Sequence, residues 1–329
     1  MTQTKQLKAF ITGATGFLGL HLCQQLLDNN WQVYALCRNK EKMSIKHKNL
    51  VIIEGDILAP KAIEKQLPIN LDALFHTAAS TNTWFKNNGM QTTTNITGTQ
   101  NMLAMAKATN VKRFIHISSV VVFGIHTTLK NITETMPKAG KNSWINYVKT
   151  KTASENLVLN TKELDCVIIN PTHIIGPGDK HNWARLIKMI ATQKLPSIPN
   201  GAGSFVDVRD VVSGIIQVYH HGKTGENYLL GGTDMTFTKF VNAVANKLNV
   251  KATTVQLPNF LLMALAQTKN FISRLTNKEP DITPESATLI SDLYACDAVK
   301  ARVELNYQTR DFETTLNDTI NFLKTIKLI

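Results

Sequence analysis

The feature that most constrains the fold is a glycine-rich turn near the N-terminus. Residues 12–19 read Thr-Gly-Ala-Thr-Gly-Phe-Leu-Gly, between a short apolar run and a helical pattern. Glycines there permit a tight turn, a close backbone approach to a pyrophosphate and close contact between helix and strand. The free N–H groups at the helix start favour a bound phosphate. The turn could be purely structural, but its context predicts a dinucleotide site at Gly13, Thr15, Gly16, Phe17 and Leu18.

Short apolar runs alternate with helical patterns along the first half of the chain, as in βαβ units. The patterns predict strands at 8–12, 32–37, 50–54, 73–77, 112–118 and 166–170, and helices at 17–29, 95–109 and 146–160. Continuous apolar strands are typical of a parallel sheet with helices on both faces. We therefore expect an α/β, Rossmann-type doubly wound parallel sheet over residues 1–172. A smaller, mainly helical substrate-binding region should follow over 173–329, with segment 205–222 packing back on the first domain.

Composition excludes several other classes of protein. Of the 329 residues, 43% are hydrophobic and 18% charged, which is not the composition of a disordered chain. The apolar run 260–266 is far shorter than the roughly 20 residues of a membrane span. The four cysteines lie far apart without a CxxC pair, and no residues have metal-ligand spacing. With no room for a signal peptide before residue 8, we expect a soluble cytoplasmic protein without a metal.

The net charge is +12, and one basic stretch stands out after the second predicted strand. Arg38, Lys40, Lys42, Lys46 and Lys48 are opposed there only by one glutamate. A solvated basic loop is one interpretation, and no nucleic-acid-binding motif accompanies the charge. The strand ends in Cys-Arg, without the acid that holds the ribose hydroxyls of NAD. Because a guanidinium binds phosphate in bidentate fashion, Arg38 with Lys40 or Lys42 predicts a site for the 2′-phosphate of NADP.

A Tyr-x-x-x-Lys pair lies in the predicted helix 146–160. Tyr147 and Lys151 are four residues apart and so share one helix face, downstream of the serine pair 118–119. Tyr219 and Lys223 have the same spacing, but they follow a helix and enclose Gly222. We interpret that second pair as a helix C-terminus without chemistry.

Taken in order, these motifs resemble the extended short-chain dehydrogenase/reductase family, that of the NAD-dependent epimerases and dehydratases. Further segments that match it in order are Gly-Asp-Ile at 55–57, Asp-Ala-Leu-Phe-His-Thr-Ala-Ala at 72–79, Asn-Ile-Thr-Gly-Thr at 95–99, Gly-Pro-Gly at 176–178 and Phe-Val-Asp-Val-Arg-Asp-Val at 205–211. The resemblance covers residues 7–235. Beyond them the chain is diffusely similar to the dihydroflavonol reductase-like branch.

The resemblance implies roles for individual residues. Cofactor contacts are expected from Asp56, Ile57, Thr77, Ala78, Ala79, Tyr147, Lys151 and Pro171, besides the glycine turn, Arg38 and Lys42. Tyr147 would donate a proton to the carbonyl oxygen, and Ser119 would hold that oxygen by a hydrogen bond. Lys151 would lower the pKa of Tyr147 and bind the ribose. Asn95 is a further catalytic candidate, which as a helix-start residue could serve only to order the site.

Departures from the family pattern narrow the expected reaction. Two valines follow Ser119, where the family's 4,6-dehydratases carry an Asp-Glu pair. Asn170 and the pair 203–204 replace arginine-containing positions typical of the nucleotide-sugar enzymes. We therefore expect an NADP(H)-dependent reductase of a ketone or aldehyde, or equivalently an alcohol dehydrogenase. A nucleotide-sugar epimerase is the second choice, and a non-catalytic NADP-binding sensor or scaffold is the alternative from another class.

The expected partner is a small carbonyl or alcohol molecule, with neither nucleic acid nor membrane, and a homodimer is a further possibility. The apolar helical segment 257–278 could lie on a membrane surface, but a cap or subunit-contact helix is the favoured interpretation. His76 and His116 fall in apolar strand patterns and are expected to be hydrogen-bonded core residues.

Overall fold

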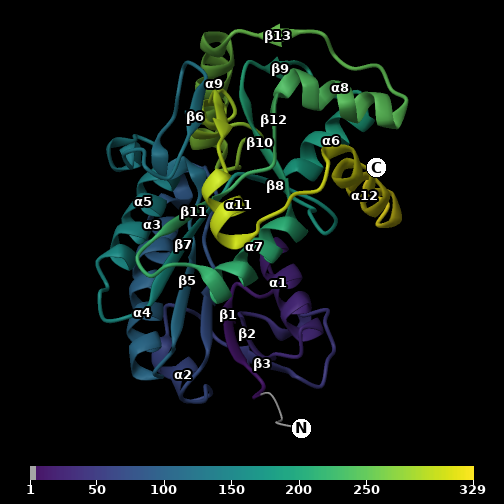
Figure 1. Ribbon diagram of the computed structural model, residues 1–329. Coiled ribbons are helices and arrows are strands. Elements are labelled where there is room, and N and C mark those ends of the chain that lie inside the picture. The colour runs from purple at the N-terminus through teal and green to yellow at the C-terminus, as the bar shows by residue number, and fades with distance from the viewer. Residues whose placement is uncertain (1–4) are drawn as a thin grey trace.

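A computed structural model describes residues 5–329 and shows a seven-stranded parallel sheet at its centre (Figure 1). Its strands are β1 (Lys8–Thr12), β2 (Gln32–Cys37), β3 (Leu50–Glu54), β4 (Ala73–His76), β5 (Arg113–Ile117), β7 (Cys166–Pro171) and β11 (Asn227–Leu230). They lie in the order β11-β7-β5-β4-β1-β2-β3, and every neighbouring pair is parallel. The chain order therefore reverses between β1 and β4. Crevices that bind ligands form at such reversals.

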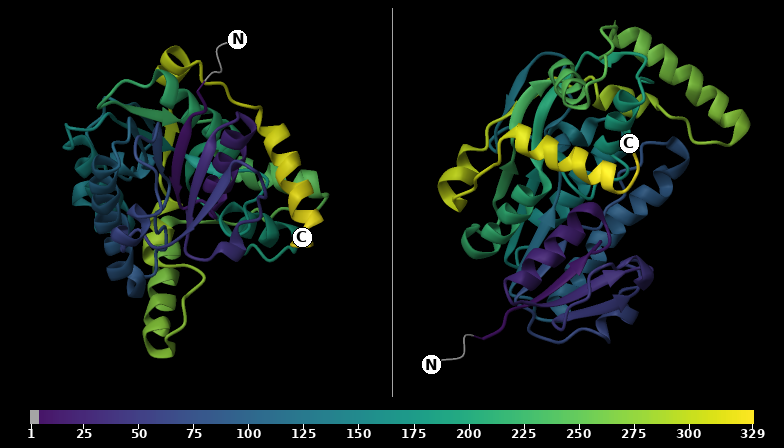
Figure 2. Two further views of the ribbon diagram at one scale, coloured as in Figure 1. Left: turned by 90° about the horizontal axis from the view of Figure 1, so that it is seen from below. Right: turned by 90° about the vertical axis from the view of Figure 1, so that its right-hand side faces the viewer.

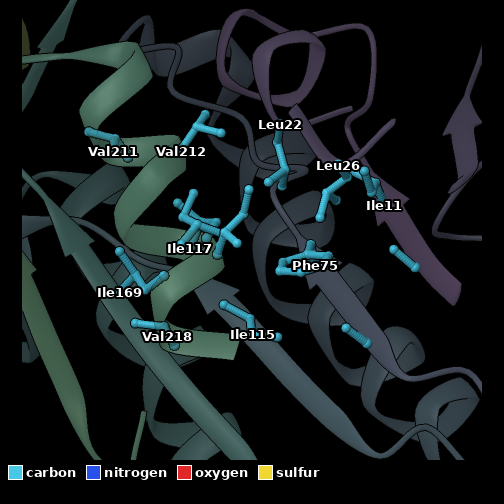
Figure 3. Packing of buried hydrophobic residues seen from close by; sticks show 14 of the residues in the cluster. Ile11, Leu22, Leu26, Phe75, Ile115, Ile117, Ile169, Val211, Val212 and Val218 are labelled. Atoms are coloured by element: carbon cyan, nitrogen blue, oxygen red, sulfur yellow. The ribbon is translucent and has the colours of Figure 1, made fainter. Parts of the chain in front are cut away.

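Helices cover both faces of this sheet. One face carries α1 (Phe17–Asp28), α7 (Val208–His221) and α11 (Val299–Leu305), and the other carries α2 (Pro60–Glu64), α4 (Gly98–Ala108) and α5 (Asn146–Leu159). Figure 3 shows the first interface, where side chains of α1 and α7 meet those of β1, β4, β5 and β7. Both faces of the strands are thus buried, which explains the continuous apolar runs of the sequence. The segment α7, distant in sequence, packs beside α1.

The second part of the chain combines helices with short strands. Its helices are α6 (Trp183–Ala191), α8 (Phe237–Leu248), α9 (Asn259–Thr276), α10 (Pro284–Leu289) and α12 (Phe312–Thr325). Its strands β8 (His173–Ile175), β10 (Ala202–Asp207) and β12 (Thr233–Thr236) form one sheet, and β9 (Ile198–Pro199) pairs with β13 (Gln256–Leu257). Its strand β14 (Tyr294–Cys296) pairs with β6 (Lys130–Ile132) of the first part. None of these short strands was predicted, because short strands carry little periodic signal.

A cluster of aromatic rings forms the core of this second part. The ring of Phe205 stacks on Phe240 at 4.7 Å, and Trp183 lies edge-on to Phe205 at 4.8 Å. Figure 2 shows α9 projecting from the body of the molecule as a yellow-green arm. Large apolar side chains of this helix, including Phe260, Phe271 and Leu275, are exposed. Within residues 5–329, no helix combines the length and the apolar character that crossing a bilayer requires.

Candidate active site

A cavity of about 500 Å³ lies beyond the carboxyl ends of β1, β2 and β4, where the strand order reverses. Ten of the residues predicted to bind a cofactor line it: Gly13, Thr15, Gly16, Arg38, Lys42, Asp56, Ile57, Thr77, Ala78 and Ala79. Seven further lining residues were missed from the sequence: Leu36, Cys37, Gly55, Leu58, Ser80, Met90 and Thr94. Most of these directly flank predicted positions, whereas Met90 and Thr94 come from a helical segment whose start was misplaced.

The glycine turn forms one wall of this cavity. Gly13 has a left-handed φ of +67°, and a Cβ there would lie only 2.8 Å from the nitrogen of Ala78 and from Oγ1 of Thr77. The N-cap of α1 is Gly16, which makes no side-chain cap, and the first turn has no acidic residue. The first N–H groups of α1 have no intrahelical acceptors. With Gly13 and Gly16 they form a cradle at the cavity wall, where the close approach of Thr77 and Ala78 admits no side chain at position 13. This geometry fits a phosphate group.

The segment after β4 is fastened to the glycine turn by Thr12. Its buried hydroxyl accepts a hydrogen bond from the Ala78 nitrogen at 3.2 Å, and its carbonyl accepts one from the Thr77 hydroxyl at 2.6 Å. The same hydroxyl is 2.8 Å from Nδ1 of His76, whose Nε2 is 3.0 Å from the hydroxyl of Thr99. His76 is thus a hydrogen-bonded core residue, as predicted. His116 is buried beside it, with Nε2 3.4 Å from the Ser154 hydroxyl.

Two exposed cations lie at the end of β2. A 3-10 turn, η1 (Lys40–Lys42), is capped by Asn39, whose side-chain oxygen accepts a hydrogen bond from the Glu41 nitrogen at 2.8 Å. This turn brings Lys42 to the cavity wall beside Arg38, whereas Lys40 is not part of the lining. Within the described residues, neither Arg38 nor Lys42 forms an ion pair. Cys37, where an acid would stand in an NAD site, is a buried thiol with a raised pKa.

The predicted catalytic hydroxyls meet between α5 and the end of β5. Ser119 caps η4 (Val120–Phe123), a 3-10 turn, through a 3.4 Å hydrogen bond from the Val121 nitrogen. Its side chain also lies near the phenol of Tyr147, in the first turn of α5, and acts on the pKa of that phenol. Burial raises the pKa of Tyr147, and the nearby Ser119 side chain opposes that rise. The phenol is therefore held in its protonated form at neutral pH.

Lys151 lies one turn further along α5 and is buried. Its ammonium donates a hydrogen bond to the carbonyl oxygen of Ile117 at 2.7 Å. Burial lowers the pKa of Lys151 to about 8, and the nearby Glu155 carboxylate acts in the opposite direction. In the structure, desolvation raises the pKa of Tyr147 and the Ser119 side chain acts in the opposite direction. The expected effect of Lys151 on the pKa of Tyr147 stays a prediction.

The sequence pattern predicts that Asn95 begins a helix, and the structure corrects this. The chain is helical from α3 (Asn88–Thr92) through a π-helical turn, η3 (Thr93–Thr97), into α4. Within η3, the buried Asn95 side chain accepts from the Ser80 nitrogen at 2.7 Å and donates to the Thr150 hydroxyl at 3.0 Å. Because Ser80 lines the cavity and Thr150 lies between Tyr147 and Lys151, Asn95 joins the cavity to the catalytic candidates.

Several other predicted residues lie away from the cavity lining. Ser119, Tyr147, Lys151, Phe17, Leu18 and Pro171 are not among the residues that line it. Pro171 ends β7, buried and paired in register with Leu230 of β11. The second Tyr-x-x-x-Lys pair makes structural contacts. Tyr219 packs edge-on against Trp31 at 4.7 Å, and Lys223 forms an ion pair with Glu304 at 2.9 Å. Residues 5–329 contain no cluster of three or more side chains that could hold a metal ion.

A parallel sheet with a glycine turn at its strand reversal defines a Rossmann-type dinucleotide-binding protein. More narrowly, the chain belongs to the NAD dependent epimerase/dehydratase family, whose family model matches residues 9–231. This family of NAD(P)-dependent enzymes includes oxidoreductases and epimerases.

Individual relatives fall into both classes. A putative dihydroflavonol 4-reductase of Synechocystis sp. is 26% identical over 325 residues, covering 96% of this chain and 94% of the relative. A UDP-glucose 4-epimerase of Vibrio cholerae is 28% identical over 295 residues, covering 85% and 88%. Among solved structures, the Bordetella bronchiseptica enzyme WbmH in complex with NAD+ has a TM-score of 0.78 and 20% identity, covering 97% of this chain and 99% of that one. This last likeness concerns the fold alone.

Proposed function

We propose that the chain is an NADP(H)-dependent oxidoreductase that reduces a ketone or aldehyde group of a small molecule, or oxidises the corresponding alcohol. The observation that carries the proposal is the grouping of Ser119 and Tyr147 with Lys151, whose ammonium lies one helical turn beyond Tyr147 and binds the carbonyl oxygen of Ile117. When bound, NADP(H) supplies or accepts the hydride. The chain itself must then hold the carbonyl and move one proton.

The protonation states of the site suit carbonyl reduction. Burial keeps the Tyr147 phenol protonated, so that it can donate its proton to the carbonyl oxygen as negative charge develops there. The Ser119 hydroxyl holds the same oxygen by a hydrogen bond. The Lys151 ammonium has donors left after its bond to Ile117, since an ammonium carries three N–H groups, and these would hold the cofactor's ribose.

The cavity residues fit an NADP molecule. The cradle at Gly13 and Gly16, with the start of α1, would hold the pyrophosphate. Arg38 and Lys42 are unpaired within residues 5–329 and would bind the 2′-phosphate, which a carboxylate in place of Cys37 would repel. Asp56 and Ile57 would lie beside the adenine, and Thr77, Ala78 and Ala79 behind the rest of the cofactor.

A nucleotide-sugar epimerase is the second candidate, favoured by the similarity to the UDP-glucose 4-epimerase. Three buried positions speak against it. Asn170 is bonded to Glu155, Gly203 lies against the His173 ring, and the Ser204 hydroxyl accepts from the Gly232 nitrogen at 3.0 Å. These positions offer no cation to a diphosphate. The non-catalytic scaffold ranks third, because Tyr147 and Lys151 are both present.

One assay separates the three functions. The purified chain is mixed with NADPH and a panel of ketones and aldehydes, and loss of the reduced cofactor's absorbance is followed against a no-enzyme blank. A parallel set of UDP-sugars with NAD+ is examined for epimerised product. Carbonyl-dependent oxidation of NADPH supports the reductase, whereas epimerised sugar without it supports the second candidate. Cofactor binding without either reaction would leave the scaffold as the function.

A further inference from the structure

A buried carboxylate lies one turn beyond Lys151 on the same face of α5. Glu155 is 1% exposed, and its Oε2 accepts hydrogen bonds from the Ser118 hydroxyl at 2.5 Å and from Nδ2 of Asn170 at 2.9 Å. These donors come from the ends of β5 and β7. The carboxylate thus binds α5 to the two strands that carry Ser119 and Pro171.

The cation that balances this carboxylate comes from outside the helix and the sheet. Lys138, just before the 3-10 turn η5 (Ala139–Asn142), places its Nζ 2.7 Å from Oε1 of Glu155. The same ammonium lies 4.0 Å from the centre of the Phe123 ring in η4, the turn capped by Ser119. Burial lowers the pKa of Lys138, and Glu155 opposes that effect. An ionised carboxylate so deeply buried requires such a partner.

Three consecutive residues at the end of β5 are therefore held by three different side chains. Lys151 binds the carbonyl oxygen of Ile117, Glu155 binds the hydroxyl of Ser118, and Asn170 donates to the carbonyl oxygen of Ser119 at 3.2 Å. Two of these three side chains also contact each other, since Asn170 donates a hydrogen bond to Glu155. Glu155 thus holds the Ser118 side chain directly and the Ser119 carbonyl oxygen through Asn170.

We propose that Glu155 and Lys138 are positioning residues of the Ser119–Tyr147–Lys151 site, with Lys138 acting through Glu155. This inference rests on the proposed function, because it assigns the pair to that site. The alternative is that the pair only stabilises the fold. A purely structural ion pair would leave the titration of Lys151 and the pH dependence of turnover unchanged.

The charged surroundings of Glu155 determine the direction of the effect. Lys151 faces it from α5 and Lys138 from the loop before η5, while the nearby His116 of β5 is kept neutral because burial lowers its pKa well below the ordinary value. Glu134 and Lys300 act on Lys138 with opposite signs. Without the negative charge of Glu155, Lys151 would still be buried, but the carboxylate that favours its charged form would be gone. The pKa of Lys151 should then fall below about 8.

The test uses the whole chain with ¹³C-labelled lysine side chains, and the Lys151 resonance is assigned by its loss in Lys151→Arg. In Glu155→Gln, which keeps the size of the side chain, the Lys151 titration should move to lower pH by about one unit, a tenfold change in proton affinity. The alkaline limb of kcat should move by the same amount, with the KM for NADPH nearly constant. If wild type reduces no carbonyl, the proposed function fails, while the titration still tests the coupling of Glu155 to Lys151.

A double-mutant cycle tests the part assigned to Lys138. Lys138→Met should lower kcat at pH 7, Lys138→Arg should restore it, and Lys138→Met should cost nothing further in the Glu155→Gln background. Asp210→Asn is the matched control, because Asp210 is a buried carboxylate paired with Arg310 on other elements. It should lower the melting temperature without moving the Lys151 titration. A Glu155→Gln variant that behaves like this control, or additive losses in the cycle, would overturn the proposal. Should Glu155→Gln not fold, the Lys138→Met and Lys138→Arg pair decides by the same kcat comparison.

Discussion

The ammonium of Lys151 donates a 2.7 Å hydrogen bond to the carbonyl oxygen of Ile117, two residues before Ser119. The contact fixes the lysine beneath the segment that carries the serine hydroxyl and buries its charge. Burial is the reason that the pKa of Lys151 falls to about 8, whereas it raises the pKa of Tyr147. The same desolvation thus weakens the charged forms of both groups, and the lysine becomes the first of the two to lose its proton as the pH rises.

The alkaline limit of turnover should therefore be set by Lys151. Activity in the reductive direction is expected to fall as the pH rises through about 8, because the lysine becomes neutral there while Tyr147 still holds its proton. Lys151→Arg keeps a permanent positive charge, so its residual activity should persist to higher pH. The measurement is kcat between pH 6 and pH 10 for both proteins. An alkaline limb at the same pH in Lys151→Arg would show that another group sets it.

Because α1 lies in close contact with the glycine turn, we expect alanine substitutions at two glycines to change the stability of the protein differently. A Cβ at Gly19 would overlap the carbonyl oxygen of Gly13, whereas a Cβ at Gly89 in α3 would meet nothing within 4 Å. Gly19→Ala should lower the free energy of unfolding by about 1–3 kcal/mol, the usual cost of overpacking. Gly89→Ala should be neutral or stabilising by up to about 1 kcal/mol, since alanine favours the helix. Urea denaturation of both variants is the measurement, and equal losses would contradict this account of the turn.

The sequence predicted those parts of the molecule whose signals are local. The strands of the large sheet end within a residue of their predicted limits, because each is an apolar run bounded by turn residues. The glycine turn and the spacing of Tyr147 and Lys151 are likewise readable in a single short segment.

The parts that were missed depend on contacts between distant segments. Asn95 has the residue type of a helix cap, but its side chain is occupied by Ser80 and Thr150, and the helix begins earlier. The pairing of Glu155 with Lys138 crosses from a helix to a loop, and nothing in either local pattern indicates it. The pKa of Tyr147 rises through burial, which residue spacing cannot reveal.

The buried histidines predict how stability depends on pH. Desolvation lowers the pKa of His76 from 6.5 to about 3, so the folded protein keeps it neutral while the unfolded chain takes up a proton below about pH 6.5. Its contribution to stability is complete above pH 6.5 and is lost progressively as the pH falls toward 3. At pH 5 the loss from this residue is about 2 kcal/mol.

Unfolding free energies from urea titrations at pH 7 and pH 5 measure this loss. His76→Asn should be less stable at pH 7, because it disturbs the bonds to Thr12 and Thr99, but its stability should fall less between the two pH values. His47→Asn, at an exposed histidine, is the control and should keep the wild-type difference. An undiminished difference in His76→Asn would assign the pH dependence to other groups.

The two cations that line the cavity at the end of β2, Arg38 and Lys42, predict cofactor preference. NADP(H) should bind at least tenfold more tightly than NAD(H), a difference of about 1.4 kcal/mol that one charge-assisted hydrogen bond can supply. Arg38→Ala should remove most of this preference and leave the affinity for NAD(H) unchanged. Lys40→Ala is the matched control, because Lys40 follows in the same turn but does not line the cavity. Calorimetric titration with both cofactors is the measurement, and equal affinities in wild type would refute the assignment of the phosphate site.

Removing only the hydroxyl of Tyr147 should cause a large loss of turnover. Tyr147→Phe keeps the ring and its packing but removes the hydroxyl beside Ser119 that is assigned as proton donor. General acid–base catalysis contributes about a hundred- to ten-thousand-fold, so kcat should fall within that range while NADPH affinity changes little. Lys151→Ala should impair both turnover and binding, because the lysine is assigned to the ribose as well.

Tyr219→Phe provides the matched control for that experiment. Tyr219 belongs to a second Tyr-x-x-x-Lys pair, but its ring packs against Trp31 and its lysine is paired with Glu304. The substitution should change neither turnover nor cofactor affinity. Steady-state rates with a carbonyl found in the panel, together with NADPH titration, are measured for each variant. If Tyr147→Phe retained more than about a tenth of wild-type turnover, the loss would lie well outside the general acid–base range, and the proton would have to come from another group.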